Sequence, residues 1–417
     1  MNRFHPRESG GRAERPERPV TPLLRSVAGD PRRPRADTHR NLSPRLRYFG
    51  IVKISPRAAL ALGAGILALL AGCAAAPETR LADRTPGEAA LAKEKIVEQR
   101  RFSDQTIAEL VPDQQPGCSA AVAVQGAVVW AGAAGLADLD ASTPVSTSTR
   151  FDIASISKQF TATAVLMLQR EGLLSLADPI GAYVDDLPAW SETVTLDQLM
   201  HQTSRIPDYW VELDEVGIGF SQPADQATTL DAIRREDELE PGTGFLYSNS
   251  NYVLLAEVVG RVSGEALPDF LAKRIFVPLG LDMVLAPTLS GSDIALSYDD
   301  KLQLQIAGWT SYGHTGIIAT PSELARWGDQ YRAGDFIKGD YAVGAVNDGD
   351  GELYAAGINI EADGDLSHTG RMGGYVSDFT VSADRETVIV VMCNGHLSNR
   401  FPIADALWAI WDQPRRT

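Results

Sequence analysis

Residues that ligate metals or carry redox chemistry are scarce in this sequence. Its 417 residues include three cysteines and six histidines, and neither a C-x-x-C pair nor an H-E-x-x-H motif occurs. No group of histidines and cysteines has the spacing of a zinc site. We therefore expect neither a metal nor a cofactor, so any catalysis must come from the chain's own side chains.

A hydrophobic run long enough to cross a bilayer is missing near the N-terminus. The apolar run 58–71 is shorter than the roughly 20 residues that a spanning helix needs, and it follows the basic residues Lys53 and Arg57. A basic flank, a short apolar stretch and small residues are typical of an export signal. The run ends in L-A-G-C at Cys73, which resembles the lipobox of bacterial lipoproteins. The alternative is an ordinary signal peptide in which Cys73 occurs by chance.

The segments around this signal lack the patterning of a folded domain. Residues 1–51 are rich in Arg, Pro and Gly and are expected to be a disordered leader, unless translation starts at Val52 and they are never made. Residues 52–73 then form the signal peptide, and residues 74–87 form a tether. The lipobox resemblance implies a lipid anchor on Cys73. We therefore expect an exported bacterial lipoprotein at the periplasmic face, and the alanine after the cysteine is similar to that of outer-membrane lipoproteins.

Positive charge is depleted beyond the leader. Of the 38 basic and 54 acidic residues, 14 and 5 lie in residues 1–57, which leaves 24 basic and 49 acidic residues, a net charge of −25, in residues 58–417. Such a surface repels nucleic acids, so we expect no nucleic-acid partner.

The hydrophobic pattern predicts strands at both ends of the folded region and helices between them. Residues 88–115 hold an N-terminal helix, and residues 116–412 form one domain. Predicted strands span residues 119–124, 127–131, 376–381 and 387–393. Predicted helices span residues 88–111, 155–171, 252–262, 267–276, 320–331 and 404–411. This order favours an α+β fold whose terminal strands meet in a single antiparallel sheet flanked by helices.

Two cysteines mark the ends of predicted strands. Cys118 opens the first strand and Cys393 closes the last one. If these strands are antiparallel neighbours, the two sulfurs can come within bonding distance, and an exported protein can keep such a bond oxidised. The alternative is a pair of buried free thiols that pack as small apolar residues.

The first chemical motif is S-I-S-K at residues 155–158. Ser155 and Lys158 lie one helical turn apart on one face. A serine hydroxyl needs a base to remove its proton, and a lysine can be that base if burial destabilises its ammonium form. The apolar run after Lys158 predicts such burial. The pattern alone is also compatible with an N-capping serine and a surface lysine.

The second motif is Y-S-N at residues 247–249. Tyr247 can relay a proton between the nucleophile, Lys158 and a leaving group if Lys158 stabilises its phenolate form. Asn249 lies two residues further on, so in an extended segment it points to the same side and can bind Lys158 or a substrate amide. A half-buried tyrosine followed by a turn-forming asparagine is the alternative.

The third motif, H-T-G, occurs twice. The copy at residues 314–316 leads into a helix that starts with the capping box at Thr320. The copy at residues 368–370 precedes the terminal strand pair. A substrate-flanking motif needs an edge strand that binds an extended acyl chain and a glycine that permits close approach. We therefore choose His368, Thr369 and Gly370 and leave the earlier copy outside the site.

S-x-x-K, Y-x-N and H-T-G in this order resemble the three motifs of the penicillin-recognising serine hydrolases, the superfamily of class C β-lactamases, D-Ala-D-Ala carboxypeptidases and related esterases. The surrounding sequence is similar as well, in F-D-I-A-S at residues 151–155, which ends with the nucleophile, L-M-H-Q-T-S at residues 199–204 and P-G at residues 241–242. The resemblance runs from about residue 116 to residue 411. It implies a β-lactamase/transpeptidase-like fold, an antiparallel sheet flanked by helices plus an all-α region.

The resemblance also implies roles for individual residues. Ser155 is the nucleophile, Lys158 and Tyr247 share the proton work, and Asn249 orients. The backbone N–H groups of Ser155 and Arg371 form the oxyanion hole, and residues 368–370 flank the acyl group.

Two positions depart from the family pattern. His368 stands where most β-lactamases of the family have lysine, and a partly cationic histidine holds a substrate carboxylate less firmly. Arg205 stands where the family has glycine, so it either crowds the cleft or contacts an anion. His201 is expected to be structural. Trp190, Tyr209 and Trp210 either line the mouth of the cleft or belong to ordinary packing, and the sequence leaves both possibilities open.

These motifs predict a serine hydrolase that forms an acyl-enzyme on Ser155 and cleaves an ester or amide of a small molecule or peptide. Esters, D-amino-acid peptides and peptidoglycan-like substrates rank ahead of β-lactams. A non-catalytic lipoprotein that binds cell-wall peptide is the rival from another class, although a binding module has no need of Ser155, Lys158 and Tyr247 together. The oligomeric state stays open.

Overall fold

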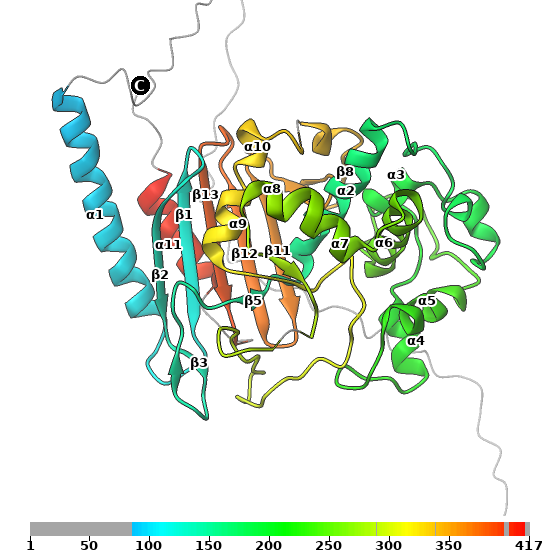
Figure 1. The fold of residues 1–417 in the computed structure, drawn as a ribbon, viewed down its shortest axis with the longest axis horizontal. Coiled ribbons are helices and arrows are strands. Elements are labelled where there is room, and N and C mark those ends of the chain that lie inside the picture. Colours follow the sequence, from blue (N-terminus) through cyan, green and yellow to red (C-terminus); the bar gives the residue numbers. More distant parts are fainter. Residues whose placement is uncertain (1–85, 289, 338, 396–399, 413–417) are drawn as a thin grey trace, which may run out of the picture. The chain divides into compact units, whose positions relative to one another are not determined.

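The structure is a computed structural model, and it describes residues 86–412 except residues 289, 338 and 396–399 (Figure 1). The leader, the signal peptide, Cys73 and most of the tether lie outside the described residues. Within the described part, the helices are too short or too polar to cross a membrane.

One antiparallel sheet of eight strands organises the domain, in the order β2-β1-β13-β12-β11-β10-β9-β8. The long strands are β1 (Cys118–Val124), β2 (Ala127–Ala134), β11 (Leu366–Met372), β12 (Tyr375–Val381) and β13 (Thr387–Cys393). The short ones at one edge are β8 (Val346–Asn347), β9 (Leu353–Tyr354) and β10 (Asn359–Ile360). Gln125 and Gly126 both have positive φ, of 52° and 80°, and this pair makes the tight turn between β1 and β2. The predicted strands at both ends of the chain and their antiparallel pairing are confirmed.

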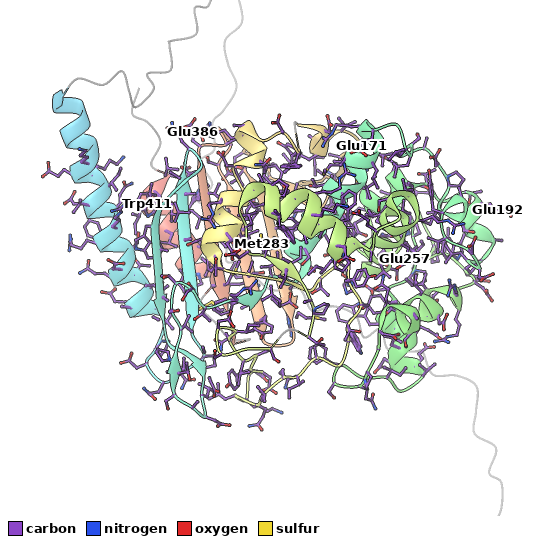
Figure 2. All side chains as sticks on the ribbon, viewed as in Figure 1. Glu171, Glu192, Glu257, Met283, Glu386 and Trp411 are labelled. Atoms are coloured by element: carbon purple, nitrogen blue, oxygen red, sulfur yellow. A yellow bond between two sulfur atoms is a disulfide. The ribbon has the colours of Figure 1, made fainter. Side chains whose placement is uncertain are left out.

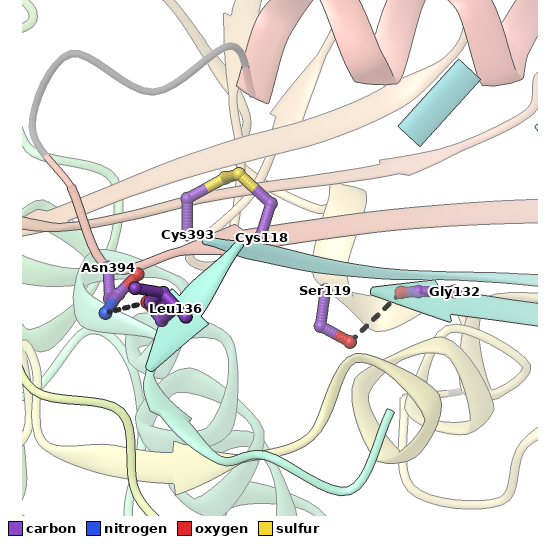
Figure 3. Close-up of a disulfide and its surroundings, with 6 residues drawn as sticks. All are labelled: Cys118, Ser119, Gly132, Leu136, Cys393 and Asn394. Carbon is purple, nitrogen blue, oxygen red and sulfur yellow. Dashed lines mark hydrogen bonds between the residues drawn. A yellow bond between two sulfur atoms is a disulfide. The ribbon is translucent and has the colours of Figure 1, made fainter. Parts of the chain in front are cut away.

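The pairing of β1 with β13 places the two cysteines opposite each other. Cys118 and Cys393 are partners in the strand register, and their sulfurs form a disulfide (Figure 3). The alternative of two free thiols is therefore wrong. Beside the bond, the Asn394 side chain donates to the carbonyls of Leu136, Ala137 and Leu296 at 3.1, 3.2 and 2.7 Å. The amide thus ties the end of β13 to residues 136–137 and to the loop that holds Leu296.

Helices cover both faces of the sheet (Figure 1). On one face lie α1 (Pro86–Leu110) and α11 (Arg400–Trp411). Trp411, labelled in Figure 2, donates its indole N–H to Ser103 of α1 at 2.8 Å. The other face packs on the large core around α2 (Lys158–Arg170), α6 (Asn249–Ser263) and α9 (Pro321–Trp327). Because both faces are covered, the central strands are buried on both sides, as in β13, where every residue is buried.

The remaining elements form the mainly helical region and its connections. The helices are α3 (Leu196–Met200), α4 (Tyr209–Glu215), α5 (Gln226–Arg234), α7 (Leu267–Leu271), α8 (Val277–Leu279) and α10 (Gln330–Ala333). The short helical turns are η2 (Ala154–Ser157), η3 (Ile180–Ala182), η4 (Ala189–Glu192), η5 (Ala272–Phe276) and η6 (Asp340–Ala342). Short strands outside the main sheet are β3 (Leu136–Asp138), β4 (Thr143–Pro144), β5 (Phe151–Asp152), β6 (Val284–Leu285) and β7 (Ile317–Ala319).

Several helix boundaries differ from the sequence-based expectation. The Thr320 capping box is present, with its side chain accepting from Glu323, but α9 ends at Trp327, and α10 continues separately. The predicted helix 267–276 is α7 followed by the π-helical turn η5. The helix predicted from residue 252 begins three residues earlier, which places Asn249 in its first turn.

Candidate active site

Ser155 lies in a short 3₁₀ turn that leads into α2, rather than in the α-helix itself. The residue before it, Ala154, has a φ of 50°, a left-handed conformation that costs energy for a residue with a side chain. The Asp152 carboxylate accepts the Ala154 N–H at 2.7 Å and the Gly316 N–H at 3.3 Å. Burial raises the pKa of Asp152 to about 6. This buried carboxylate therefore holds the strained turn that presents Ser155.

Lys158 is fully buried directly behind the serine. Its Nζ lies 3.1 Å from Ser155 Oγ, 2.7 Å from Asn249 Oδ1 and 3.1 Å from the His314 carbonyl oxygen. Burial lowers the pKa of Lys158 to about 7, against the opposing attraction of Asp208. A neutral amine can donate to Asn249 and His314 and turn its lone pair to the serine hydroxyl, which is the geometry of a general base.

Tyr247 contacts both the nucleophile and Lys158. Its ring centroid lies 4.8 Å from Lys158 Nζ, and its hydroxyl hydrogen-bonds with Ser155. Burial raises the pKa of Tyr247 well above its ordinary value, although the Ser155 hydrogen bond opposes this. The resting side chain is therefore a neutral phenol that can donate a proton, and not a resting phenolate.

Asn249 bridges the lysine and a carboxylate that the sequence analysis did not single out. The expectation of an extended segment at Asn249 is wrong, because Asn249 is the first residue of α6 and Ser248 is its N-cap. Its Oδ1 accepts from Lys158, and its Nδ2 donates to Asp208 Oδ2 at 2.8 Å. Asp208 lies 41 residues earlier in the chain, so only the tertiary structure reveals this contact.

The 368–370 copy of H-T-G lies in β11, next to the nucleophile turn. A Cβ on Gly370 would lie 2.3 Å from the Ile153 carbonyl oxygen, so only glycine allows this approach. Strand β10 pairs with β11 at Leu366 and Ser367. Within the described part of the chain, no strand pairs with residues 368–372 on that side, so β11 offers an open edge there.

His368 is neutral at physiological pH. Its ring Nδ1 hydrogen-bonds with the Thr369 carbonyl at 2.7 Å. Burial first, and the nearby Lys158 charge second, lower the pKa of His368 to about 3. The expectation of a partly cationic histidine is therefore wrong, because a buried imidazole beside a lysine resists protonation.

The 314–316 copy also belongs to the site. The carbonyl of His314 accepts from Lys158, and its ring Nε2 lies 2.8 Å from the Tyr209 hydroxyl. Burial lowers the pKa of His314 well below its ordinary value. The interpretation that placed this copy outside the site is wrong, because the loop before β7 folds back over α2.

Ser155, Tyr247, Asn249 and the two histidines His314 and His368 face one cavity of about 360 Å³. Its lining combines the nucleophile, both H-T-G copies, an aromatic wall and three charged residues. The lining residues are Ser155, Tyr209, Trp210, Phe245, Tyr247, Asn249, Trp309, His314, Thr315, Asp348, Tyr354, Asn359, His368, Thr369, Gly370, Arg371, Met372 and Arg400.

The structure also separates the open alternatives among nearby residues. Tyr209 and Trp210 line the cavity, whereas Trp190 is buried elsewhere and donates to the Glu236 carbonyl at 2.7 Å. His201 is fully buried, and its Nδ1 lies 3.0 Å from the Asp197 carbonyl oxygen, as expected for a structural histidine.

Arg205 does not line the cavity, so it does not crowd the cleft. It has a φ of 65°, the conformation for which the family's glycine is suited. Its guanidinium donates to the carbonyls of Glu240 and Pro241. The Arg205 side chain therefore holds the loop around residues 240–241, which precedes Tyr247, in place. Among the described residues, no group of three or more His, Cys, Asp and Glu side chains could hold a metal ion.

Comparison with known proteins identifies the family to which this chain belongs. The family model described as Beta-lactamase matches residues 103–410. A D-aminopeptidase from Brucella anthropi is 30% identical over 296 residues, covering 67% of this chain and 56% of that protein. Penicillin-binding protein 4* of Bacillus subtilis is 29% identical over 186 residues, covering 43% of this chain and 40% of that protein.

The solved structure of EstCE1, a hydrolase with promiscuous acyltransferase activity, shares the fold. It superposes with a TM-score of 0.64 at 19% sequence identity, over 76% of this chain and 100% of that one. This chain spans about half the length of the curated relatives that it matches. The match of the family model over residues 103–410, nearly the whole described part, shows that the chain belongs to the Beta-lactamase family.

Proposed function

We propose that this protein is a serine hydrolase that forms an acyl-enzyme on Ser155. One observation carries the proposal: a fully buried lysine, whose pKa burial lowers to about 7, lies 3.1 Å from the hydroxyl of a partly buried serine in a cavity. Placing a lysine in the core is costly, and a base with a pKa near the working pH is what serine activation requires.

The two half-reactions follow from the positions of these groups. Neutral Lys158 takes the Ser155 proton as the serine oxygen bonds to the substrate carbonyl carbon. The backbone N–H groups of Ser155 and Arg371 stabilise the oxyanion. Tyr247 donates its proton to the leaving nitrogen or oxygen as that bond breaks, and the Lys158 ammonium reprotonates Tyr247. Water then attacks the acyl-enzyme with the same transfers reversed, which releases the acid and restores the serine.

The aromatic side of the cavity favours a flat, apolar group on the substrate. Tyr209, Trp210 and Trp309 form an aromatic wall, in which the Trp309 centroid lies 5.9 Å from that of Tyr209 and 6.1 Å from that of Trp210. The indole N–H of Trp309 donates to the Gly219 carbonyl at 3.2 Å, so the wall is held in place without substrate. Flat apolar groups gain most from such a surface.

The substrate is proposed to be an ester or an amide of a D-amino acid or peptidoglycan-like peptide, with β-lactams second. The names of the relatives, D-aminopeptidase and penicillin-binding protein, support this range. Neutral His368 itself provides no charge for a substrate carboxylate, which ranks β-lactams second. Arg371 and Arg400 also line the cavity, so β-lactams stay within the proposed range.

The experiment is a kinetic panel on the purified protein. We expect hydrolysis of p-nitrophenyl phenylacetate and of D-phenylalanine amide, with a higher kcat/KM than for p-nitrophenyl acetate and L-phenylalanine amide. Trp210→Ala should lower the preference for phenylacetate over acetate, while Trp190→Ala, outside the cavity, should not. A protein that binds these compounds but turns none of them over would instead be the non-catalytic binding lipoprotein.

We also propose that Cys73, outside the described residues, carries a lipid anchor that holds the enzyme at the periplasmic face of the outer membrane. Two or three acyl chains anchor a protein stably where one does not. Growth with a palmitate analogue should label the wild-type protein, and Cys73→Ser should remove the label. A wild-type protein that is unlabelled and freely secreted would contradict the anchor.

A further inference from the structure

Asp208 occupies a position that normally serves its own helix. It is the N-cap residue of α4, where aspartate usually accepts a backbone N–H of the helix that it precedes. Its side chain makes no such bond. The matched residue Asp225, N-cap of α5, does cap its own helix and accepts from the Thr228 N–H at 2.8 Å.

The Asp208 carboxylate is instead directed at the first residue of α6. Oδ2 accepts the backbone N–H of Asn249 at 2.9 Å and its side-chain Nδ2–H at 2.8 Å. One oxygen therefore fixes both the start of α6 and the side chain that the helix presents to the active site. The contact is sheltered, since Asp208 Oδ1 is buried as well.

This contact determines which end of the Asn249 amide faces the lysine. An amide has a donor end and an acceptor end of nearly equal size, so its hydrogen-bond partners decide its orientation. A carboxylate only accepts, so it binds the NH₂ end. The oxygen end then faces Lys158 and accepts from Nζ at 2.7 Å. The reversed amide would point two N–H groups at the amine and occupy or repel the lone pair that must take the serine proton.

We propose that Asp208 is a positioning residue for catalysis, which acts through Asn249 by holding the amide oxygen toward Lys158. The inference rests on the proposed function, because it assigns Asp208 to the machinery of the same Ser155 site. It also connects the aromatic wall to the nucleophile, since Tyr209 of the wall follows Asp208 directly in the chain.

The charge of Asp208 has a separate effect, because it favours the protonated form of Lys158 and so opposes burial. It raises the pKa of Lys158 against the larger effect of burial, while burial raises the pKa of Asp208 itself. The facing groups are the amine of Lys158, the phenols of Tyr209 and Tyr247, the Asn249 amide and the Trp210 side chain, which hydrogen-bonds with Asp208.

The test is a double-mutant cycle on kcat with p-nitrophenyl phenylacetate, using Asp208→Ala, Asn249→Ala and the double variant. Each single substitution should lower kcat by about 10–10²-fold, with a smaller change in KM. This is less than the roughly 10²–10⁴-fold that a general base contributes, because Lys158 is still present and only its partner is misplaced. Because Asp208 acts through Asn249, the double variant should be about as slow as Asn249→Ala alone. Losses that multiply would overturn the proposal, as would an unchanged kcat for Asp208→Ala.

A conservative variant separates positioning from a general loss of structure. Asp208→Asn keeps an oxygen that can accept both Asn249 N–H groups, so it should recover most of the kcat that Asp208→Ala loses. Asp225→Ala removes an N-cap of the same type outside the cavity and should lower the thermal midpoint without changing kcat. Equal kcat losses for Asp208→Asn and Asp208→Ala would contradict the proposal. Labelling of the variants by a fluorophosphonate tests separately whether Ser155 is a reactive nucleophile. Ser155→Ala, which should not be labelled, is the negative control.

Discussion

The tripeptide H-T-G occurs twice in this chain, and both copies border the same cavity with different backbones. Residues 314–316 lie in a loop, where the His314 carbonyl accepts from Lys158 and Gly316 has a φ of 95°. Residues 368–370 lie in β11, paired residue by residue with β12, and Gly370 approaches the Ile153 carbonyl.

The two copies show that the same three letters can act through different atoms. The first copy serves Lys158 through a backbone oxygen, which any residue at that position would provide. The second copy offers an open strand edge and depends on a glycine for close contact with the nucleophile turn. Side-chain substitutions and glycine substitutions should therefore affect the two copies differently.

The largest effect is expected from Lys158→Ala, which removes the group that the first copy holds. Ser155 would lose its base, so kcat/KM for p-nitrophenyl phenylacetate should fall by about 10³-fold or more. Lys273→Ala is the control, because Lys273 is exposed and paired with Glu265. A Lys158→Ala variant with near-normal turnover would remove the lysine from the mechanism.

The pH dependence tests the same group without substitution. Because the neutral amine is the base and burial lowers the pKa of Lys158 to about 7, kcat/KM should rise as the pH increases through about 7 and then level off. The kinetics of the same ester between pH 5 and about 9 measure this. A rate that is flat across this window would show that Lys158 does not titrate there.

Glycine substitutions should separate the copies most clearly. In Gly370→Ala, the new Cβ would meet the Ile153 carbonyl at 2.3 Å, so β11 must move away from Ser155 and kcat/KM should fall by about 10²-fold. In Gly316→Ala, the positive φ and a contact of 2.5 Å with Pro287 should mainly lower the thermal midpoint. Kinetics and thermal melts of both variants check this, and the reverse pattern would contradict the comparison.

Histidine substitutions should have smaller effects. His368→Ala removes a side chain that lines the cavity. It should raise KM by up to about tenfold with little change in kcat, because the lost contact binds the substrate and the transition state equally. His314→Ala keeps the backbone carbonyl that binds Lys158 and loses the contact with Tyr209. Its kcat should therefore change less than that of any Lys158 variant. A kcat loss for His314→Ala as large as that for Lys158→Ala would mean that the imidazole itself takes part.

The smallest effect on activity is expected at the disulfide, which lies in the sheet that carries the second copy. The double variant Cys118→Ser/Cys393→Ser opens a loop with a sequence separation of 275 residues. The loop-entropy model assigns such a bond roughly 4–5 kcal/mol of stability, while kcat/KM at 25 °C should be almost unchanged. Chemical denaturation measures the difference, and thiol counting on the unreduced wild type should find no free thiol at either position.

The sequence predicted the parts of the fold that rest on local patterns. Alternating strands at both ends, the Gln125-Gly126 turn and the Thr320 capping box are all present. The two-residue strands β8, β9 and β10 were not predictable, because a pair of residues has no measurable period. In the site, residues 155–158 are local to one turn and were readable from their spacing.

The missed parts of the site depend on contacts between distant segments. Asp208 meets Asn249 across 41 residues, and the His314 carbonyl meets Lys158 across 156 residues. Neither contact leaves a spacing signal, and the His314 contact uses a backbone atom that every residue has. The low pKa of His368 likewise follows from burial, which the letters H-T-G do not encode.

The most direct test of the account is the mass of the covalent intermediate. Wild-type protein treated with a fluorophosphonate, or quenched during turnover of p-nitrophenyl phenylacetate, should gain the mass of one adduct. Peptide mapping should place that adduct on Ser155, and Ser155→Ala should remain unmodified while keeping its fold. An adduct on any other residue, or one that persists in Ser155→Ala, would contradict the assignment of Ser155 as the nucleophile.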